Sequence, residues 1–259
     1  MKKVWITALD KDEQEVQKLM VTLKGYGLGV DGHFWVDELA KMAWDSALEN
    51  LSAKDVSVWI ILGKADQYQI PTICQGLSML ALSVQHRRGI GFPILLVSPQ
   101  GEINAASLPT PLKGADILPP ALAALGPKIV ALANKPIPSI TPAYRLNIHP
   151  IHGIGLWFEV GPPAGGLDWP GAMFGVHGTE IDFHGVGPAD GVPERTVLEY
   201  ALKGMQLRLG EDEFTAWAVQ NNLSGESSYY VRLKGVPDKI IFGAFATGDE
   251  AEVHTIALC

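Results

Sequence analysis

The chain has 259 residues, of which 47% are hydrophobic and 19% are charged. That length suits two domains of ordinary size, and the composition is typical of globular proteins rather than of disordered chains or coiled coils. The longest apolar runs are too short to cross a bilayer, and acidic residues follow the N-terminus too soon for a signal peptide. The only two cysteines, Cys74 and Cys259, do not suggest a disulfide framework. We therefore expect a soluble cytoplasmic protein.

The negative charge is concentrated in the second half of the chain. Residues 1–133 contain 12 lysines and arginines against 13 acidic residues, a net charge of −1. Residues 134–259 contain 8 against 15, a net charge of −7. Neither half has the basic stripe that binding to a phosphate backbone requires. We therefore expect neither nucleic acid nor a membrane as a partner.

Residues 1–133 alternate between short apolar runs and segments with helical spacing. Helices are predicted to begin at Asp10, where Glu13 completes a capping-box pattern, at Asp37, at Pro71 and at Pro119. Strands are predicted at Val4–Leu9, Leu28–Phe34, Val56–Leu62, Phe92–Val97 and Ala115–Leu118. Because such alternation places helices on both faces of a parallel sheet, we predict an α/β domain with a doubly wound, parallel five-strand sheet.

Three prolines in residues 134–143 predict an extended linker. Beyond it, residues 144–259 are rich in glycine and in strand-like segments. One helix is predicted at about Pro193 to Met205. Strands are predicted at Leu156–Val160, Met173–His177, Thr179–His184, Phe214–Val219, Tyr229–Leu233, Lys239–Phe245 and Val253–Leu258. We therefore expect a second domain of α+β type with a mostly antiparallel sheet.

Part of the first domain resembles a known family. The features that carry the resemblance are Val4–Leu9, Asp10-Lys11-Asp12, Leu23-Lys24-Gly25-Tyr26-Gly27, Leu48-Glu49-Asn50-Leu51 and Asp55–Leu62. In these features residues 4–97 resemble a TIR domain. The resemblance implies a flavodoxin-like sheet and either a role as a signalling adaptor or, as in many bacterial members, cleavage of NAD.

The catalytic signature of that family is incomplete here. The enzymes of that family share a Trp-Cys-x-x-Glu sequence at the start of the third helix. The corresponding sequence in this chain is Ile73-Cys74-Gln75-Gly76-Leu77. Leu77 stands where the glutamate would be, so the resemblance favours an adaptor or a ligand-sensing role over NAD cleavage. The first strand is followed by no G-x-G-x-x-G motif, and the chain contains no P-loop.

Polar residues follow several of the predicted strands. In an open parallel sheet, ligands bind beyond the carboxyl ends of the strands, where the strand order reverses. That rule gathers Thr7, Asp10, Lys64, Asp66 and Ser98 around one crevice. The alternative is that Asp10 only caps a helix and that the others are ordinary loop residues.

The second half offers a weaker candidate for a metal site. Glu180, Asp182 and His184 alternate and would share one face of a strand, and His177 or His152 would complete a ligand set. The alternative is a solvated face opposite two core residues at positions 181 and 183. Aromatic residues are also frequent in this half, and such side chains usually pack in the hydrophobic core.

We therefore expect a non-catalytic, bacterial-type regulatory or signalling protein without a bound cofactor. Its first domain would serve assembly, by self-association or with a protein partner, or would bind a small nucleotide-like ligand. One alternative is an enzyme that cleaves a nucleotide or glycosyl bond, with Asp10 or Asp66 as acid or base. Another is a metal-dependent hydrolase built on His177, Asp182 and His184.

Overall fold

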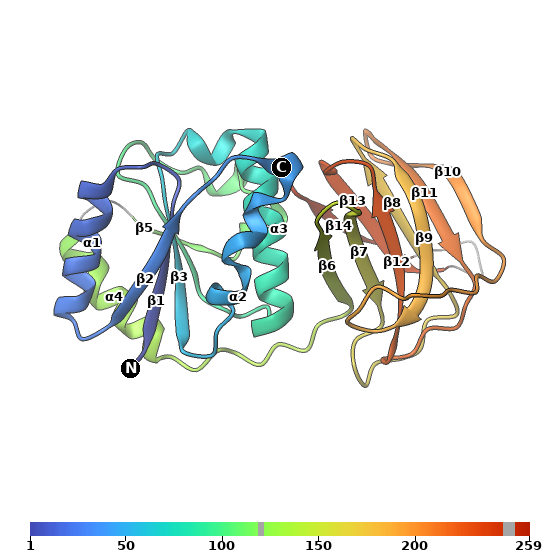
Figure 1. Ribbon diagram of the computed structural model, residues 1–259, viewed down its shortest axis with the longest axis horizontal. Helices are drawn as coiled ribbons and strands as arrows, with labels where there is room; N and C mark the ends of the chain where they lie inside the picture. Colours follow the sequence, from blue (N-terminus) through green and yellow to red (C-terminus); the bar gives the residue numbers. More distant parts are fainter. Residues whose placement is uncertain (119–121, 246–251) are drawn as a thin grey trace. The chain divides into compact units, whose positions relative to one another are not determined.

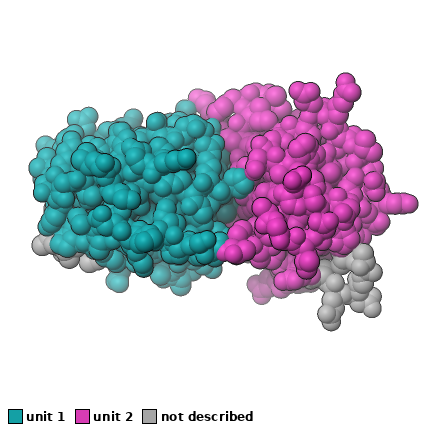
Figure 2. All heavy atoms as spheres, turned by 90° about the horizontal axis from the view of Figure 1, so that it is seen from below, with its two compact units in different colours: residues 1–39, 43–140 teal, residues 40–42, 141–259 magenta. Residues whose placement is uncertain are grey.

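The computed structural model describes residues 1–118, 122–245 and 252–259 (Figure 1). The chain divides into two compact units. The first comprises residues 1–39 and 43–140, and the second comprises residues 40–42 and 141–259 (Figure 2). The change from one unit to the other at residue 141 lies within the proline-rich segment 134–143. Among the helices of the described residues, none has both the length and the apolar character needed to span a bilayer.

The first unit is built on a five-stranded, all-parallel sheet, as predicted. Its strand order is β2-β1-β3-β4-β5. The strands are β1 (Lys3–Ala8), β2 (Gly29–Phe34), β3 (Val56–Leu62), β4 (Ile94–Val97) and β5 (Asp116–Leu118). Every residue of β3 is buried, which explains its nearly continuous apolar sequence.

Helices lie on both sides of this sheet. Helices α1 (Glu13–Gly25) and α4 (Leu122–Asn134) lie on one side, and α2 (Leu48–Leu51) and α3 (Pro71–Arg88) lie on the other (Figure 1). Short 3-10 turns connect the elements: η1 (Leu39–Lys41), η2 (Ala43–Ala47), η3 (Gln67–Gln69), η4 (Ala105–Ser107) and η5 (Thr110–Leu112). Apolar side chains of β1, β3 and β4 pack against those of α1 and α4 in one core cluster, which includes Ile6, Leu19, Leu23, Ile60, Val97, Leu125 and Ile129.

Two predicted helix starts are wrong. Helix α1 begins at Glu13, and its N-cap is Asp12, whose Oδ1 accepts a hydrogen bond from the Glu15 N–H at 3.0 Å. Asp37 begins no regular helix, because its carboxylate accepts a hydrogen bond from the Thr72 hydroxyl at 2.8 Å. The chain there makes η1, η2 and the short α2 instead, with a left-handed residue, Met42 (φ 55°), between η1 and η2. The predicted start of the last helix at Pro119 lies outside the described residues.

The second unit consists of two antiparallel sheets. One has the order β10-β11-β8-β13-β14 and the other the order β6-β7-β12-β9. The seven predicted strands are confirmed as β7 (Gly155–Gly161), β8 (Ala172–His177), β9 (Ile181–Pro188), β11 (Asp212–Val219), β12 (Ser227–Leu233), β13 (Lys239–Ala244) and β14 (His254–Ala257). The sheets face each other through aromatic rings: Phe158 of β7 and Phe174 of β8 lie 5.6 Å apart between centroids.

The predicted helix at about Pro193 to Met205 is absent, and this prediction was wrong. Residues 189–201 are irregular, and Leu202–Leu209 form strand β10, which pairs with β11 through the turn at Gly210. A further strand that the sequence analysis missed is β6 (Arg145–Ile151), whose buried Leu146 and Ile148 alternate with polar residues. Over its described residues the second unit is therefore all-β rather than α+β.

Candidate ligand-binding site

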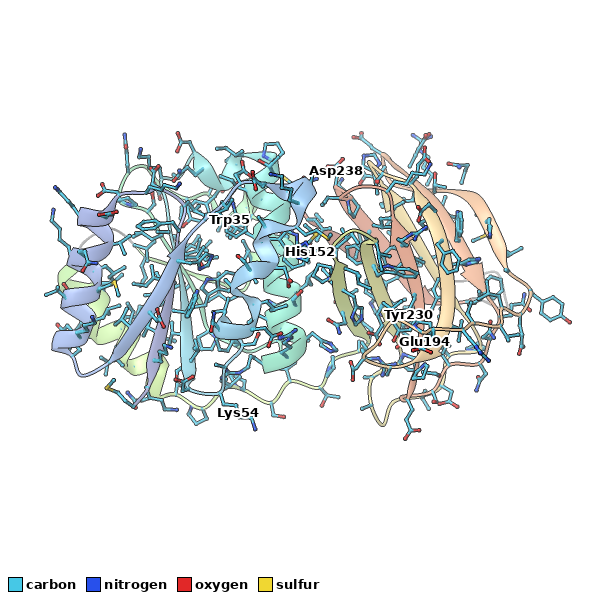
Figure 3. The ribbon with its side chains drawn as sticks, in the orientation of Figure 1. Trp35, Lys54, His152, Glu194, Tyr230 and Asp238 are labelled. Atoms are coloured by element: carbon cyan, nitrogen blue, oxygen red, sulfur yellow. The ribbon has the colours of Figure 1, made fainter. Side chains whose placement is uncertain are left out.

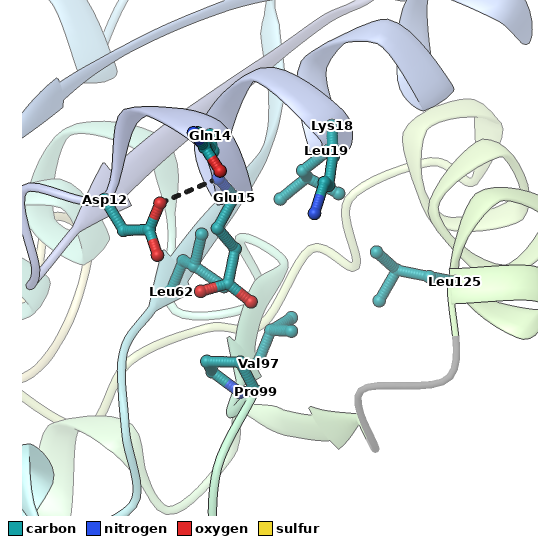
Figure 4. Close-up of a pocket in the computed structure, with 9 residues that line it drawn as sticks. All are labelled: Asp12, Gln14, Glu15, Lys18, Leu19, Leu62, Val97, Pro99 and Leu125. Carbon is teal, nitrogen blue, oxygen red and sulfur yellow. Dashed lines mark hydrogen bonds between the residues drawn. The ribbon is translucent and has the colours of Figure 1, made fainter.

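A cavity lies at the carboxyl ends of the parallel strands. Strand β2 pairs with one edge of β1, and β3 pairs with the other edge, so the strand order reverses between β1 and β3. Ligand sites of open parallel sheets form where the strand order reverses in this way. Here a cavity of about 300 Å³ is lined by Asp12, Gln14, Glu15, Lys18, Leu19, Leu62, Val97, Pro99 and Leu125 (Figure 4).

The cavity has apolar walls and a charged rim. Leu19 of α1 and Leu125 of α4 face it from two helices, and Leu62 and Val97 close it from the ends of β3 and β4 (Figure 4). The polar side chains all come from the first turns of α1 or from its cap. Because residues three or four apart on a helix share a face, the cap at residue 12 brings residues 15, 18 and 19 to the cavity together.

Glu15 is the most distinctive group of this cavity. Partial burial raises the pKa of its carboxyl, and the negative charges of Asp12 and Asp10 raise it further. Among the described residues no hydrogen-bond donor meets its carboxylate, whereas its own backbone N–H is already bonded to Asp12. The site therefore offers an acceptor whose negative charge is poorly compensated.

A smaller hollow adjoins the cavity and shares Asp12, Glu15, Leu62 and Pro99 with it. Asp10 and Lys64 border this hollow, and the Lys64 Nζ lies 3.0 Å from the Asp10 carboxylate. The hydrogen bond to Asp10 raises the pKa of Lys64. The structure thus brings together these two of the five predicted crevice residues, and it pairs their charges.

The other three predicted residues lie elsewhere. Thr7 is fully buried, and its Oγ1 accepts a hydrogen bond from Trp59 Nε1 at 2.8 Å, so it belongs to the packing of the sheet. Ser98 is also buried, and its hydroxyl donates to the Gln100 carbonyl at 2.7 Å. Asp66 precedes η3 and is not among the residues that line either hollow. The sequence analysis missed Glu15 and Lys18, which the helical spacing from Asp12 would have indicated.

The predicted metal ligands are separated. The pairing of β9 with β12 shifts register around Asp182, because Arg232 pairs with Phe183 whereas Leu233 pairs with Ile181. This bulge turns His184 into the interior, where it is 2% exposed, and leaves Asp182 outside, bonded to Arg232 at 2.8 Å.

The remaining members of that cluster have partners of their own, since Glu180 pairs with Lys234, and His177 Nδ1 lies 2.8 Å from the Glu213 carbonyl. Phe183, predicted to face the core, is 44% exposed. Within residues 1–118, 122–245 and 252–259, no three His, Cys, Asp or Glu side chains are placed to hold a metal ion. The described structure therefore does not bring the candidate ligands His177, Asp182 and His184 together.

Comparison with known proteins assigns no family. No protein-family model matches the chain, and no curated protein is detectably similar to it in sequence. The resemblance of residues 4–97 to a TIR domain stays a prediction.

Proposed function

We propose that this protein is a non-catalytic regulatory or signalling protein that binds a small nucleotide-like ligand in the cavity beyond β3 and β4. In this proposal the first unit is a flavodoxin-like, TIR-like domain. The observation that carries it is the cavity of about 300 Å³ beyond the ends of β3 and β4, whose adjoining smaller hollow reaches the reversal point between β1 and β3. Small-molecule sites combine apolar walls with a few convergent polar groups, and this cavity has both.

The charges around the cavity restrict the ligand further. Lys64 neutralises Asp10, but Asp12 and Glu15 remain as acceptors, and Lys18 is the one cation among the lining residues. A free phosphate would meet two carboxylates there, at a helix end whose Glu15 N–H is already used by Asp12. A flat ring with N–H groups would instead bond Glu15 and lie against the leucines. We therefore favour a nucleoside or a nucleobase over a dinucleotide.

Calorimetric titration of the full chain with adenosine, nicotinamide riboside, AMP and NAD tests this proposal. The nucleosides should bind, and each added phosphate should weaken binding. Glu15→Gln should weaken nucleoside binding about tenfold. The matched control is Glu13→Gln, because Glu13 lies in the same helical turn but lines a different hollow. If none of the four compounds binds, or if both variants bind equally well, the proposal fails.

One observation favours the enzymatic alternative, in which a nucleotide or glycosyl bond is cleaved. A carboxyl group with a raised pKa in a cleft is what a general acid requires, and Glu15 has that property, whereas Asp10 is paired with Lys64. Long incubation with NAD and with nucleosides, followed by chromatography for released base, separates the two proposals. Release of base that Glu15→Gln abolishes would replace the non-catalytic proposal.

A further inference from the structure

In the second unit, an irregular segment runs along the edge of the β-sandwich. Residues 189–201, here called the strap, run along the edge of the sandwich from β9 toward the end of β11. Thr196 Oγ1 accepts a hydrogen bond from the Val186 N–H at 2.7 Å. At the other end, Asn221 accepts from the Glu199 N–H at 2.9 Å and donates to the Val197 carbonyl at 3.0 Å. The strap therefore bridges the two sheets.

The strap is also held near its start. The Gly191 N–H donates to the Tyr230 hydroxyl of β12 at 3.2 Å, and Tyr230 is labelled in Figure 3. Between these anchor points the strap has no regular secondary structure. The strap is thus held at its start by the N–H groups of residues 189–191 and near its end by Thr196, Val197 and Glu199.

His184 of β9 lies inside this edge with one nitrogen unused. Its Nδ1 is 2.8 Å from the hydroxyl of Tyr229, and its Nε2 is buried without a hydrogen-bond partner in the described part of the chain. Burial raises the pKa of Tyr229 well above its usual value, so its phenol keeps its proton. Because Nδ1 is the one acceptor that this buried hydroxyl meets among the described residues, the arrangement that satisfies both groups has the hydroxyl donating to Nδ1. The proton of the neutral imidazole is then on Nε2. A buried N–H donor without an acceptor is rare in folded proteins and calls for an explanation.

Two further side chains complete the surroundings of His184. Its ring meets the indole of Trp217 edge-on, with centroids 4.8 Å apart, and the Lys203 Nζ lies 4.7 Å from the centroid of the same indole. Burial and the charge of Lys203 lower the pKa of His184 to about 4. Lys203 has no carboxylate partner among the described residues, although this half of the chain has a net charge of −7. Within the described residues, a cation without a carboxylate partner and a buried imidazole nitrogen without a hydrogen-bond partner therefore both lie against the Trp217 indole.

The strap itself is strained and carries exposed apolar groups. Tyr200 has φ +45°, a left-handed conformation that residues other than glycine rarely adopt. Its side chain is 78% exposed, and that of Val197 is 79% exposed. Backbone strain of this kind persists where the surrounding structure imposes it, and it is often found at ligand clamps. Opening of the strap at this end would break the bonds of Thr196, Val197 and Glu199 while leaving the strand pairing of both sheets intact.

We propose that the sandwich edge beneath the strap binds a small monocarboxylate with an apolar body. One carboxylate oxygen accepts a hydrogen bond from His184 Nε2, the Lys203 ammonium pairs with the same group, and the apolar body lies against Trp217. The strap moves aside to admit the ligand. A single negative charge matches the single unpaired cation, whereas a phosphate would bring more charge into an acidic unit. This site is separate from the crevice of the first unit and does not depend on the function proposed there.

Titration of the full chain with benzoate and butyrate, followed by NMR of the His184 and Trp217 side chains, tests the proposal. Both signals should shift in a saturable way, and bound carboxylate should raise the pKa of His184. Lys203→Met should weaken binding about tenfold, because it removes the charge from an exposed position without disturbing the interior. The control is Lys234→Met, which removes a cation paired with Glu180 on the same unit.

Three results would overturn the proposal. One is the absence of a saturable shift at either side chain with both acids. Another is unchanged affinity in Lys203→Met. The third is tighter binding of inorganic phosphate than of benzoate, which would identify a general oxyanion site instead. Thermal melts of Lys203→Met establish that any loss of binding does not come from unfolding.

Discussion

The buried carboxylate of Glu159 on β7 is expected to make the second unit strongly dependent on pH in the acid range. Glu159 is fully buried, and it accepts hydrogen bonds from His149 Nε2 at 2.7 Å, the Ser228 hydroxyl at 2.6 Å and the Asp190 N–H at 2.9 Å. Burial by itself would raise the pKa of Glu159, but these three bonds lower it to about 2. The carboxylate joins β6, β7, β12 and the start of the strap.

The lowered pKa can be converted into stability. In the unfolded chain the pKa of Glu159 is 4.5, and in the folded chain it is about 2. Because the folded value is the lower one, the stabilisation is fully present above pH 4.5 and is lost as the pH falls through 2. The difference corresponds to about 3 kcal/mol of unfolding free energy. Glu159→Gln should lower the stability at pH 7 by at least about 3 kcal/mol, since it breaks a buried charge network.

Native-state hydrogen exchange of the β7 and β12 amides measures the pH dependence of the unfolding free energy of the second unit alone. The wild type should lose protection between pH 4.5 and 2, and the Glu159→Gln variant should have a flatter profile from a lower starting value. Glu180→Gln is the control, because Glu180 pairs with Lys234 on the surface and should contribute about 0.5 kcal/mol or less. Two results would contradict this prediction. One is equal amide protection of Glu159→Gln and the wild type at pH 7, and the other is an equal loss of protection by both proteins over the acid range.

Three further predictions concern other residues. Burial lowers the pKa of His33 to about 4, so the first unit should lose about 3 kcal/mol as the pH falls from 6.5 through 4, and urea unfolding of His33→Asn should show a weaker dependence. Tyr200→Gly should be about 1 kcal/mol more stable than Tyr200→Ala in thermal melts, because glycine accepts the left-handed conformation. Asp12→Ala should cost about 1 kcal/mol in urea unfolding through loss of the α1 cap, whereas Asp10→Ala, which breaks an exposed ion pair, should cost less.

The sheet of the first unit could be predicted from the sequence because its strands are buried on both faces. A run such as Val56–Leu62 has no polar face to present to water, so only a central strand between two helix layers suits it. The short connections then leave parallel pairing as the simplest arrangement. The segment after Asp37 was harder, because the bond from Thr72 that engages Asp37 comes from far along the chain.

The second unit shows where local patterns mislead. Leu198, Ala201 and Leu202 fit a helical spacing, yet Met205, Leu207 and Leu209 alternate as in a strand. The strand prevails because the turn at Gly210 pairs β10 with β11, and that pairing satisfies the backbone of residues 205–209. Helical spacing within one segment cannot reveal a partner strand.

A β-bulge of one extra residue in β9 separates the candidate metal ligands. Alternation places Asp182 and His184 on one face only if the strand is regular. The bulge between them inverts the faces, so that one side chain lies at the surface and the other beneath the strap. Bulges depend on the neighbouring strand, and the sequence of β9 alone contains no sign of this one.

Of the five predicted crevice residues, only Asp10 and Lys64 border a hollow at the carboxyl edge of the parallel sheet, and the chemistry there depends on where α1 begins. If Asp10 capped α1, its carboxylate would be bound to backbone N–H groups, and Lys64 would remain an available cation for a phosphate. With Asp12 as the cap, Asp10 is free to pair with Lys64, and the helix turns Glu15 toward Leu62 and Val97. The position of the cap at residue 12 therefore favours, in the proposed site, a nucleotide-like ligand that donates hydrogen bonds to Glu15.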